Sequence, residues 1–188
     1  TLEETGVWNG REPSRSTLYR WCKERGLLRV GNDHSKDIRA FEFRGFGDLW
    51  VSDFMHGSRV LHKGRKRKTY LLAILDDASR YVVAANFHLA ESVESLMMEL
   101  RRAIIRFGLP LRFYTDNGSS YRSHLLRQVG QRFHIAMPHT PPYTPQGRGK
   151  IERFFRTVRE QFLAKTEDKT LAGLNRKLHE WVATASKA

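Results

Sequence analysis

Three acidic residues stand in segments that suit the binding of a metal ion: Asp53, Asp116 and Glu152. Asp53 lies inside the apolar run 49–55, Asp116 closes an apolar stretch before a turn, and Glu152 opens a basic amphipathic segment. The last two have 35 residues between them (117–151). A carboxylate inside a strand costs free energy unless something cationic compensates it. On a basic chain, convergence of the three would indicate a divalent-metal site that acts on phosphate.

Phosphodiester chemistry needs a nucleophilic oxygen, neutralised charge at phosphorus and a stabilised leaving oxygen. Two divalent ions roughly 3.5–4 Å apart supply all three. Hard ions such as Mg²⁺ take oxygen ligands, so two or three carboxylates suffice. Asp53, in a central strand, suits a shared ligand, and Asp116 and Glu152 suit one ion each. Three histidines stand apart from one another, and we interpret them as surface or core residues: His124, His134 and His139.

Each carboxylate also has a plain structural interpretation. Asp116 begins a common turn sequence, and Glu152 suits the first turn of a helix because of the helix dipole. Asp53 has no obvious structural use. Two further carboxylates, Asp76 and Asp77, we interpret as a hairpin turn in which one of them pairs with Arg80.

Composition narrows the class of partner. The 188 residues carry 33 Lys and Arg against 20 Asp and Glu, a net charge of +13, with 40% hydrophobic residues. This indicates a globular chain with a polyanionic partner, most often nucleic acid, although ribosomal and membrane-surface proteins share the bias. The single Cys22 fits a reducing compartment. No apolar run reaches the roughly 20 residues of a membrane span, and we expect no membrane partner.

Three regions follow along the chain. Residues 1–30 predict a short helical segment, which is either a partial helix-turn-helix or an ordinary amphipathic helix. Residues 31–47 look like a linker, and residues 48–188 form the main domain. The chain begins without Met and ends in helix-like sequence, so we expect a piece excised from a longer protein.

The main domain alternates strands and helices. Apolar runs predict strands, and helical spacing and breakers predict helices. The expected strands are 48–56, 69–75, 80–87, 111–115 and 133–137, and the expected helices are 91–107, 121–129, 149–164 and 170–183. This order predicts an α/β fold with a five-stranded mixed sheet flanked by helices.

Basic and amide residues surround the acidic ones. On the Glu152 helix, Arg156 and Arg159 share the face of Glu152 and would hold DNA phosphates, unless they merely solvate the helix. The full set of candidate DNA-binding residues is Lys150, Arg153, Arg156, Arg159, Arg148, Asn117 and Gln146. The run 62–68, His-Lys-Gly-Arg-Lys-Arg-Lys, is an exposed basic hairpin or loop that either follows DNA or is simply solvated.

Together these motifs resemble the catalytic core of DDE transposases of bacterial insertion sequences, which are similar to retroviral integrases. The resemblance covers about residues 45–185. It rests on the order of the three carboxylates, their 35-residue separation and four motifs: Asp76-Asp-Ala-Ser-Arg-Tyr81, Thr115-Asp-Asn-Gly118, Tyr143-Thr-Pro-Gln-Gly147 and Gly149-Lys-Ile-Glu-Arg-Phe-Phe-Arg-Thr157.

The resemblance implies a ribonuclease H-like fold and catalysis by Asp53, Asp116 and Glu152 with two Mg²⁺ ions, for which Mn²⁺ can substitute. It implies cleavage at transposon DNA ends, and then attack of the freed 3′-hydroxyl on target DNA. It also implies a homo-oligomer bridging two ends, in the bacterial cytoplasm with the nucleoid. Two other functions stay open: a DNA-binding protein with an inert core, and a nuclease that cuts without joining.

Overall fold

The computed structural model describes residues 20, 24, 45–115, 123–137 and 149–185. The chain divides into two units, Thr1–Arg39 and Ala40–Ala188, and nearly all described residues belong to the second. Most of the predicted segment 1–30 and of the linker 31–47 lies outside the described residues, so these two boundaries stay predictions.

The elements of the second unit follow the predicted order. They are β1 (Trp50–His62), β2 (Arg65–Asp76), β3 (Val82–His88), α2 (Val93–Phe107), β4 (Phe113–Thr115), α3 (His124–Phe133), α4 (Gly149–Thr157), the π-helix η2 (Val158–Leu163) and α5 (Leu171–Ala185). None of the described helices has the length and apolar character needed to cross a membrane.

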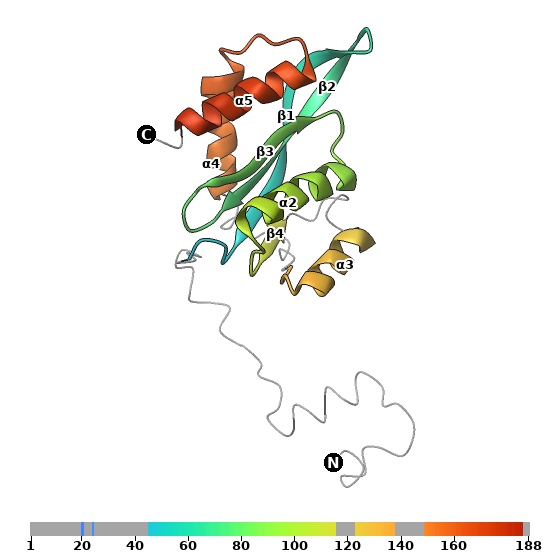
Figure 1. The fold of residues 1–188 in the computed structure, drawn as a ribbon, viewed down its shortest axis with the longest axis vertical. Helices are drawn as coiled ribbons and strands as arrows, with labels where there is room; N and C mark the ends of the chain where they lie inside the picture. The colour runs from blue at the N-terminus through green and yellow to red at the C-terminus, as the bar shows by residue number, and fades with distance from the viewer. Residues whose placement is uncertain (1–19, 21–23, 25–44, 116–122, 138–148, 186–188) are drawn as a thin grey trace. The chain divides into compact units, whose positions relative to one another are not determined.

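The sheet is mixed, with the strand order β3-β2-β1-β4 (Figure 1). β1 and β2 form a long antiparallel pair, and β3 is antiparallel to β2. β4 lies parallel to the start of β1, where Trp50 faces Phe113 and Ser52 faces Thr115. A parallel partner after three antiparallel strands requires a crossover, which α2 supplies.

The predicted count of five strands is wrong for the described part of the chain, which contains four. The segment predicted as a strand at 133–137 makes a single parallel bridge, Arg112 with Ala136. Ala136 donates its N–H to the carbonyl of Leu111 and accepts from the N–H of Phe113. Pro138 follows two residues later and has no N–H to donate, so it cannot extend this ladder as a donor.

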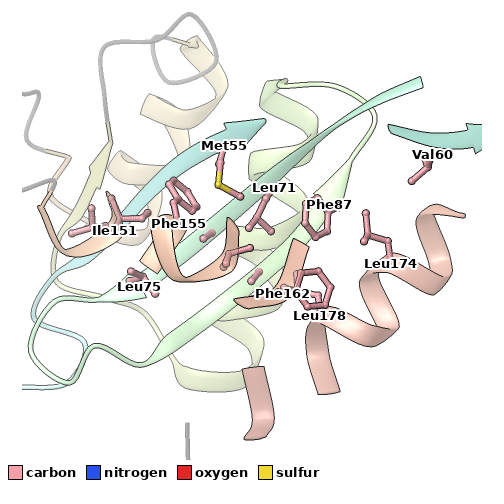
Figure 2. Packing of buried hydrophobic residues seen from close by; sticks show 14 of the residues in the cluster. Met55, Val60, Leu71, Leu75, Phe87, Ile151, Phe155, Phe162, Leu174 and Leu178 are labelled. Atoms are coloured by element: carbon pink, nitrogen blue, oxygen red, sulfur yellow. The ribbon is translucent and has the colours of Figure 1, made fainter. Parts of the chain in front are cut away.

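Helices cover both faces of the sheet because both faces are apolar. On one face, Trp50, Leu72 and Phe113 pack with Leu96 and Leu100 of α2. The other face packs against α4, η2 and α5. Figure 2 shows Ile151 and Phe155 of α4 grouped with Met55 and Leu75, and Leu174 and Leu178 of α5 further along. The result is a three-layer α/β/α domain.

Side chains of α5 cover part of the outer edge of β3. The side-chain carbonyl of Asn175 accepts from the N–H of Phe87 at 2.6 Å, and its amide donates to the Phe87 carbonyl at 3.0 Å. Nε2 of His179 lies 3.1 Å from the carbonyl of Ala85. An edge strand exposes a row of such groups, and here α5 satisfies several of them.

Candidate active site

Asp53 is held in the middle of the sheet by the register of β1. It pairs with Ala73 of β2, and its neighbours at two residues on either side, Val51 and Met55, are buried in the core beneath α4. Because side chains alternate along a strand, Asp53 points to that same face. It is half-buried, and its Oδ1 accepts from the N–H of Phe54 at 2.8 Å.

Glu152 lies in the first turn of α4 and is exposed. The helix is fixed to the sheet by its neighbours Ile151 and Phe155, which are buried in the same cluster as Val51 and Met55. The structure therefore places Glu152 on the helix that covers the Asp53 face of the sheet. Its backbone position suits a carboxylate as well, since the start of a helix carries partial positive charge.

A buried ion pair anchors the start of α4. Lys150 Nζ lies 2.7 Å from Oδ2 of Asp77 and donates to the Asp77 carbonyl at 3.1 Å. The two side chains are 17% and 3% exposed, so neither charge is well solvated. We predicted Lys150 as a DNA-binding residue. In the structure its ammonium group is bound to Asp77 within the protein. No sequence signal indicates this pair, because the residues are 73 positions apart.

Asp76 closes the turn between β2 and β3. Its carboxylate accepts from the N–H of Gly47 at 2.8 Å, and from the N–H and hydroxyl of Ser79 at 2.9 and 2.7 Å. Arg80 donates its backbone N–H to the Asp76 carbonyl. The prediction of a turn is confirmed. The turn is held by hydrogen bonds of Asp76 to backbone N–H groups and to the Ser79 hydroxyl. The carboxylate of Asp77 pairs with Lys150.

Asp116 lies outside the described residues. The last described pair of the parallel β1–β4 ladder is Ser52 with Thr115. In sequence, Asp53 directly follows Ser52, and Asp116 directly follows Thr115. Within the described residues, no group of three His, Cys, Asp or Glu side chains lies close enough to hold a metal ion. The donor set of Asp53 and Glu152 consists of carboxylate oxygens alone, which is the chemistry that Mg²⁺ prefers.

The other predicted DNA-binding residues divide into two groups. Arg153, Arg156 and Arg159 are described, and all three are exposed on α4 and η2. The opposite side of the helix is buried through Phe155, Val158 and Phe162, and Phe154 is half-buried. The remaining candidates lie outside the described residues: Asn117, Gln146 and Arg148.

A fully buried carboxylate on the opposite face, Glu99, is a structural charge. Asn86 donates to it at 2.6 Å and Arg102 at 2.8 Å, and His88 Nε2 lies 3.2 Å away. Burial raises the pKa of Glu99, but the hydrogen bonds and the nearby charges together outweigh burial and hold that pKa below its ordinary value. A groove of about 800 Å³ beside this network lies between β3, α2 and α5, and contains neither Asp53 nor Glu152.

A mixed sheet between helices, with an acidic residue in its central strand and another on the covering helix, defines the ribonuclease H-like class. Comparison with known proteins agrees. The integrase core domain family matches residues 45–145, and a second integrase core domain family matches residues 134–184. The first match covers more than half of the chain, and the chain belongs to the integrase core domain family.

Two relatives illustrate the range of similar sequences. The transposase for transposon Tn552 of Staphylococcus aureus is 36% identical over 110 residues, which cover 54% of this chain and 23% of that protein. The Gag-Pro-Pol polyprotein of bovine leukemia virus is 27% identical over 147 residues, covering 78% of this chain and 10% of the polyprotein. The chain thus spans less than a quarter of either relative.

Solved structures share the fold. The magnesium complex of the HTLV-2 integrase catalytic core domain, in its dimeric form, superposes with a TM-score of 0.57 at 20% identity, covering 78% of this chain and 88% of that one. A chain of the simian T-cell lymphotropic virus intasome in complex with PP2A regulatory subunit B56 gamma gives a TM-score of 0.59 at 22% identity, covering 79% of this chain and 50% of that one. This likeness confirms the ribonuclease H-like fold.

Proposed function

We propose that this chain is the catalytic core of a DNA transposase that cuts at transposon ends and joins the freed 3′-hydroxyl to target DNA. The observation that carries the proposal is the placement of Asp53 in the central strand beneath α4, the helix that bears Glu152. Membership of the integrase core domain family and the similarity to a bacterial transposase support it.

In this proposal Asp53, Asp116 and Glu152 would hold two Mg²⁺ ions, and Asp53 would be the ligand common to both. Bound metal would supply charge neutralisation at phosphorus and activation of the attacking oxygen. The packing of Val51 and Met55 fixes the Asp53 backbone, and the Lys150–Asp77 ion pair fixes the start of α4. These contacts fix the backbone that carries the two carboxylates, so less ordering is needed when phosphate enters.

The exposed arginines of α4 and η2 would hold the DNA. Arg156 and Arg159 follow Glu152 along the helix and are exposed. A guanidinium group can form bidentate hydrogen bonds to phosphate oxygens. We further propose a homo-oligomer acting on paired ends. The dimeric form of one neighbouring integrase core and the intasome of another support this. A bacterial cytoplasmic location is proposed from the similarity to a bacterial transposase.

The test is a strand-transfer assay with Mg²⁺ on a duplex that carries a transposon end. Glu152→Gln should lose joining while its affinity for DNA stays the same or rises, since a negative charge beside phosphate is removed. Glu160→Gln, an equivalent change at an exposed position on η2, is the matched control and should keep activity. Full joining by Glu152→Gln would contradict the proposal. Cleavage without joining by the native chain would point to a nuclease.

A further inference from the structure

The proposed chemistry leaves one strongly charged surface unused. This surface is the basic ribbon, residues 59–68, at the hairpin end of β1 and β2. Among the described residues, β1 pairs here with β2 alone, from Arg59–Lys68 to His62–Arg65, and β3 pairs with β2 no further than Tyr70. Figure 1 shows this hairpin projecting beyond the rest of the sheet. The basic run 62–68 is therefore a hairpin, as one of the two sequence interpretations has it.

The charge of the basic ribbon has one sign. Six of its ten residues are Lys or Arg and none is Asp or Glu. All six cationic side chains are exposed: Arg59, Lys63, Arg65, Lys66, Arg67 and Lys68. The exposed Lys169 adds a seventh cation beside the basic ribbon. Its backbone is held there because its carbonyl accepts a hydrogen bond from the N–H of Leu61 at 2.6 Å.

Two features of the basic ribbon cost stability in the protein alone. Arg59 and Lys68 stand directly opposite each other, and like charges at such positions repel. Lys63 occupies the tight turn with Gly64 at a φ of 49°, a left-handed conformation that favours Asn or Gly. A sequence selected for folding alone would place other residues at both positions. A bound polyanion would relieve the repulsion between Arg59 and Lys68, and it would give the cation at position 63 a role that the turn itself does not need.

The base of the basic ribbon is rigid. Val60 is 1% exposed and belongs to the core under α5. A register shift between His56 and Arg59 marks a bulge, where the hydroxyl of Thr69 donates to the Ser58 carbonyl at 2.6 Å. A bulge bends a strand and re-aims the residues beyond it. The cations are thus carried on a hairpin whose base is packed into the core.

We propose that the basic ribbon is a docking surface for the phosphate backbone of a DNA duplex, away from the acidic residues. This inference rests on the proposed function. At about 3.3 Å per residue, and with one residue taken up by the bulge, the basic ribbon begins roughly 17 Å along β1 from Asp53 and its turn lies roughly 30 Å away, somewhat less than one turn of duplex, about 34 Å. A duplex engaged at the carboxylates would therefore meet the basic ribbon about 5 to 9 base pairs away.

The chemistry of the basic ribbon favours phosphate contact over base reading. Four of its cations follow one another without a break, from Arg65 to Lys68. Because side chains alternate along a strand, these four point in turn to the two faces of the hairpin. Ionic contacts of this kind carry no sequence information and depend steeply on salt. Its one exposed apolar residue is Leu61, too little to enter a bilayer, so a lipid surface is a poorer fit.

The experiment measures binding of the 188-residue chain to a random-sequence duplex of about 30 base pairs, close to three helical turns. The ribbon variant is Arg65→Gln/Lys66→Gln/Arg67→Gln/Lys68→Gln. The control variant removes the same charge at four exposed positions elsewhere in the domain: Arg101→Gln/Arg132→Gln/Lys165→Gln/Arg176→Gln. Thermal unfolding of both variants checks that each is folded. Anionic phospholipid vesicles serve as a second ligand.

The ribbon variant should bind the duplex about tenfold or more weakly, and the slope of log affinity against log salt should shrink by about 3 to 4. The control variant should lose much less of both. Equal losses in the two variants would overturn the proposal, as would a loss confined to vesicle binding.

Joining assays distinguish failure of the docking surface from failure of the proposed function. If the native chain binds through the basic ribbon but never cuts or joins DNA, only the proposed function fails; if it joins and the ribbon variant binds normally, only the docking surface fails.

Discussion

The two ends of the β1–β2 pair treat charge in opposite ways. At the end near Trp50, Asp76 is satisfied by Gly47 and Ser79, and Asp77 is paired with Lys150. At the other end, 59–68, six cations stand together with no acidic residue among them. The first end is buried and the second is exposed.

The difference shows where charge supports the fold and where it is available for a partner. A buried carboxylate without compensation would destabilise the domain, so each of those near Trp50 has its partners inside the protein. Exposed cations are tolerated in water without partners, and they remain available to an external anion. Asp53, between the two ends and half-buried, belongs to the part that the core holds rigid.

The largest effect on stability is expected at the compensated end. Lys150→Met should destabilise the domain by about 3 kcal/mol, because it leaves the Asp77 carboxylate buried without its cation. Urea unfolding measures this. Arg153→Met, at an exposed position of the same helix, should change stability by less than about 0.5 kcal/mol. Equal effects of the two changes would show that the ion pair contributes nothing, and Asp77→Asn added to Lys150→Met should recover part of the loss.

A smaller effect is expected at the junction between the two ends. A Cβ at Gly57 would lie 2.5 Å from Thr69 Oγ1 and 2.6 Å from Phe87 Cε1, so Gly57→Ala should cost about 1–3 kcal/mol through overpacking. The control is Gly149→Ala, where a Cβ meets nothing within 4 Å and the helix should gain slightly. Duplex binding should weaken in Gly57→Ala alone, since the basic ribbon is then re-aimed. Unchanged stability in Gly57→Ala would contradict the close packing at the bulge.

Glu99 extends the comparison to pH. Because its pKa is below the ordinary value of 4.5 in the folded protein, its contribution to stability is fully present above that value. This contribution is lost as the pH falls below 4.5 towards the pKa of the folded state. Glu99→Gln should therefore flatten the fall in unfolding free energy below about pH 4.5. An identical acid profile for both proteins, measured by urea unfolding, would exclude Glu99 as a source of acid sensitivity.

The smallest effect is expected within the basic ribbon. Lys68→Gln removes the repulsion with Arg59 and should raise stability by up to about 0.5 kcal/mol at low salt. Lys68→Arg keeps the charge and should leave stability unchanged. The gain should vanish at high salt, because ions screen exposed charges. A loss of stability in Lys68→Gln would mean that an acidic partner within the protein compensates Lys68.

The order of elements was predictable because apolar periodicity is local. Residues 69–75 and 91–107 are long, regular patterns, and both form the predicted element with ends that shift by a few residues. Asp53 was placed in a strand for the same reason. Extension of β2 back to Arg65 was left open between a hairpin and a loop, since four consecutive cations carry no strand pattern and only pairing with β1 makes them extended.

Contacts between distant residues were out of reach. Nothing local indicates that Lys150 pairs with Asp77, or that Asn175 bonds to Phe87 from 88 positions away. The change of helix type at Val158 also lies outside what apolar spacing indicates, because residues 151, 155, 158 and 162 keep helical spacing through it. The segment 133–137 was wrongly predicted as a fifth strand, because a short apolar run does not specify how many backbone hydrogen bonds it makes to a neighbouring strand.

The side chain of Asn175 has a consequence for association. By bonding to both outward backbone groups of Phe87, it imitates a neighbouring strand with a single residue, and His179 does so in part at Ala85. A free extended segment that approaches β3 finds these positions taken. Growth of the sheet from one copy into the next is therefore blocked here, and copies that meet at this edge must recognise each other through side chains. Even at high local concentration, this edge is therefore not expected to nucleate cross-β aggregates.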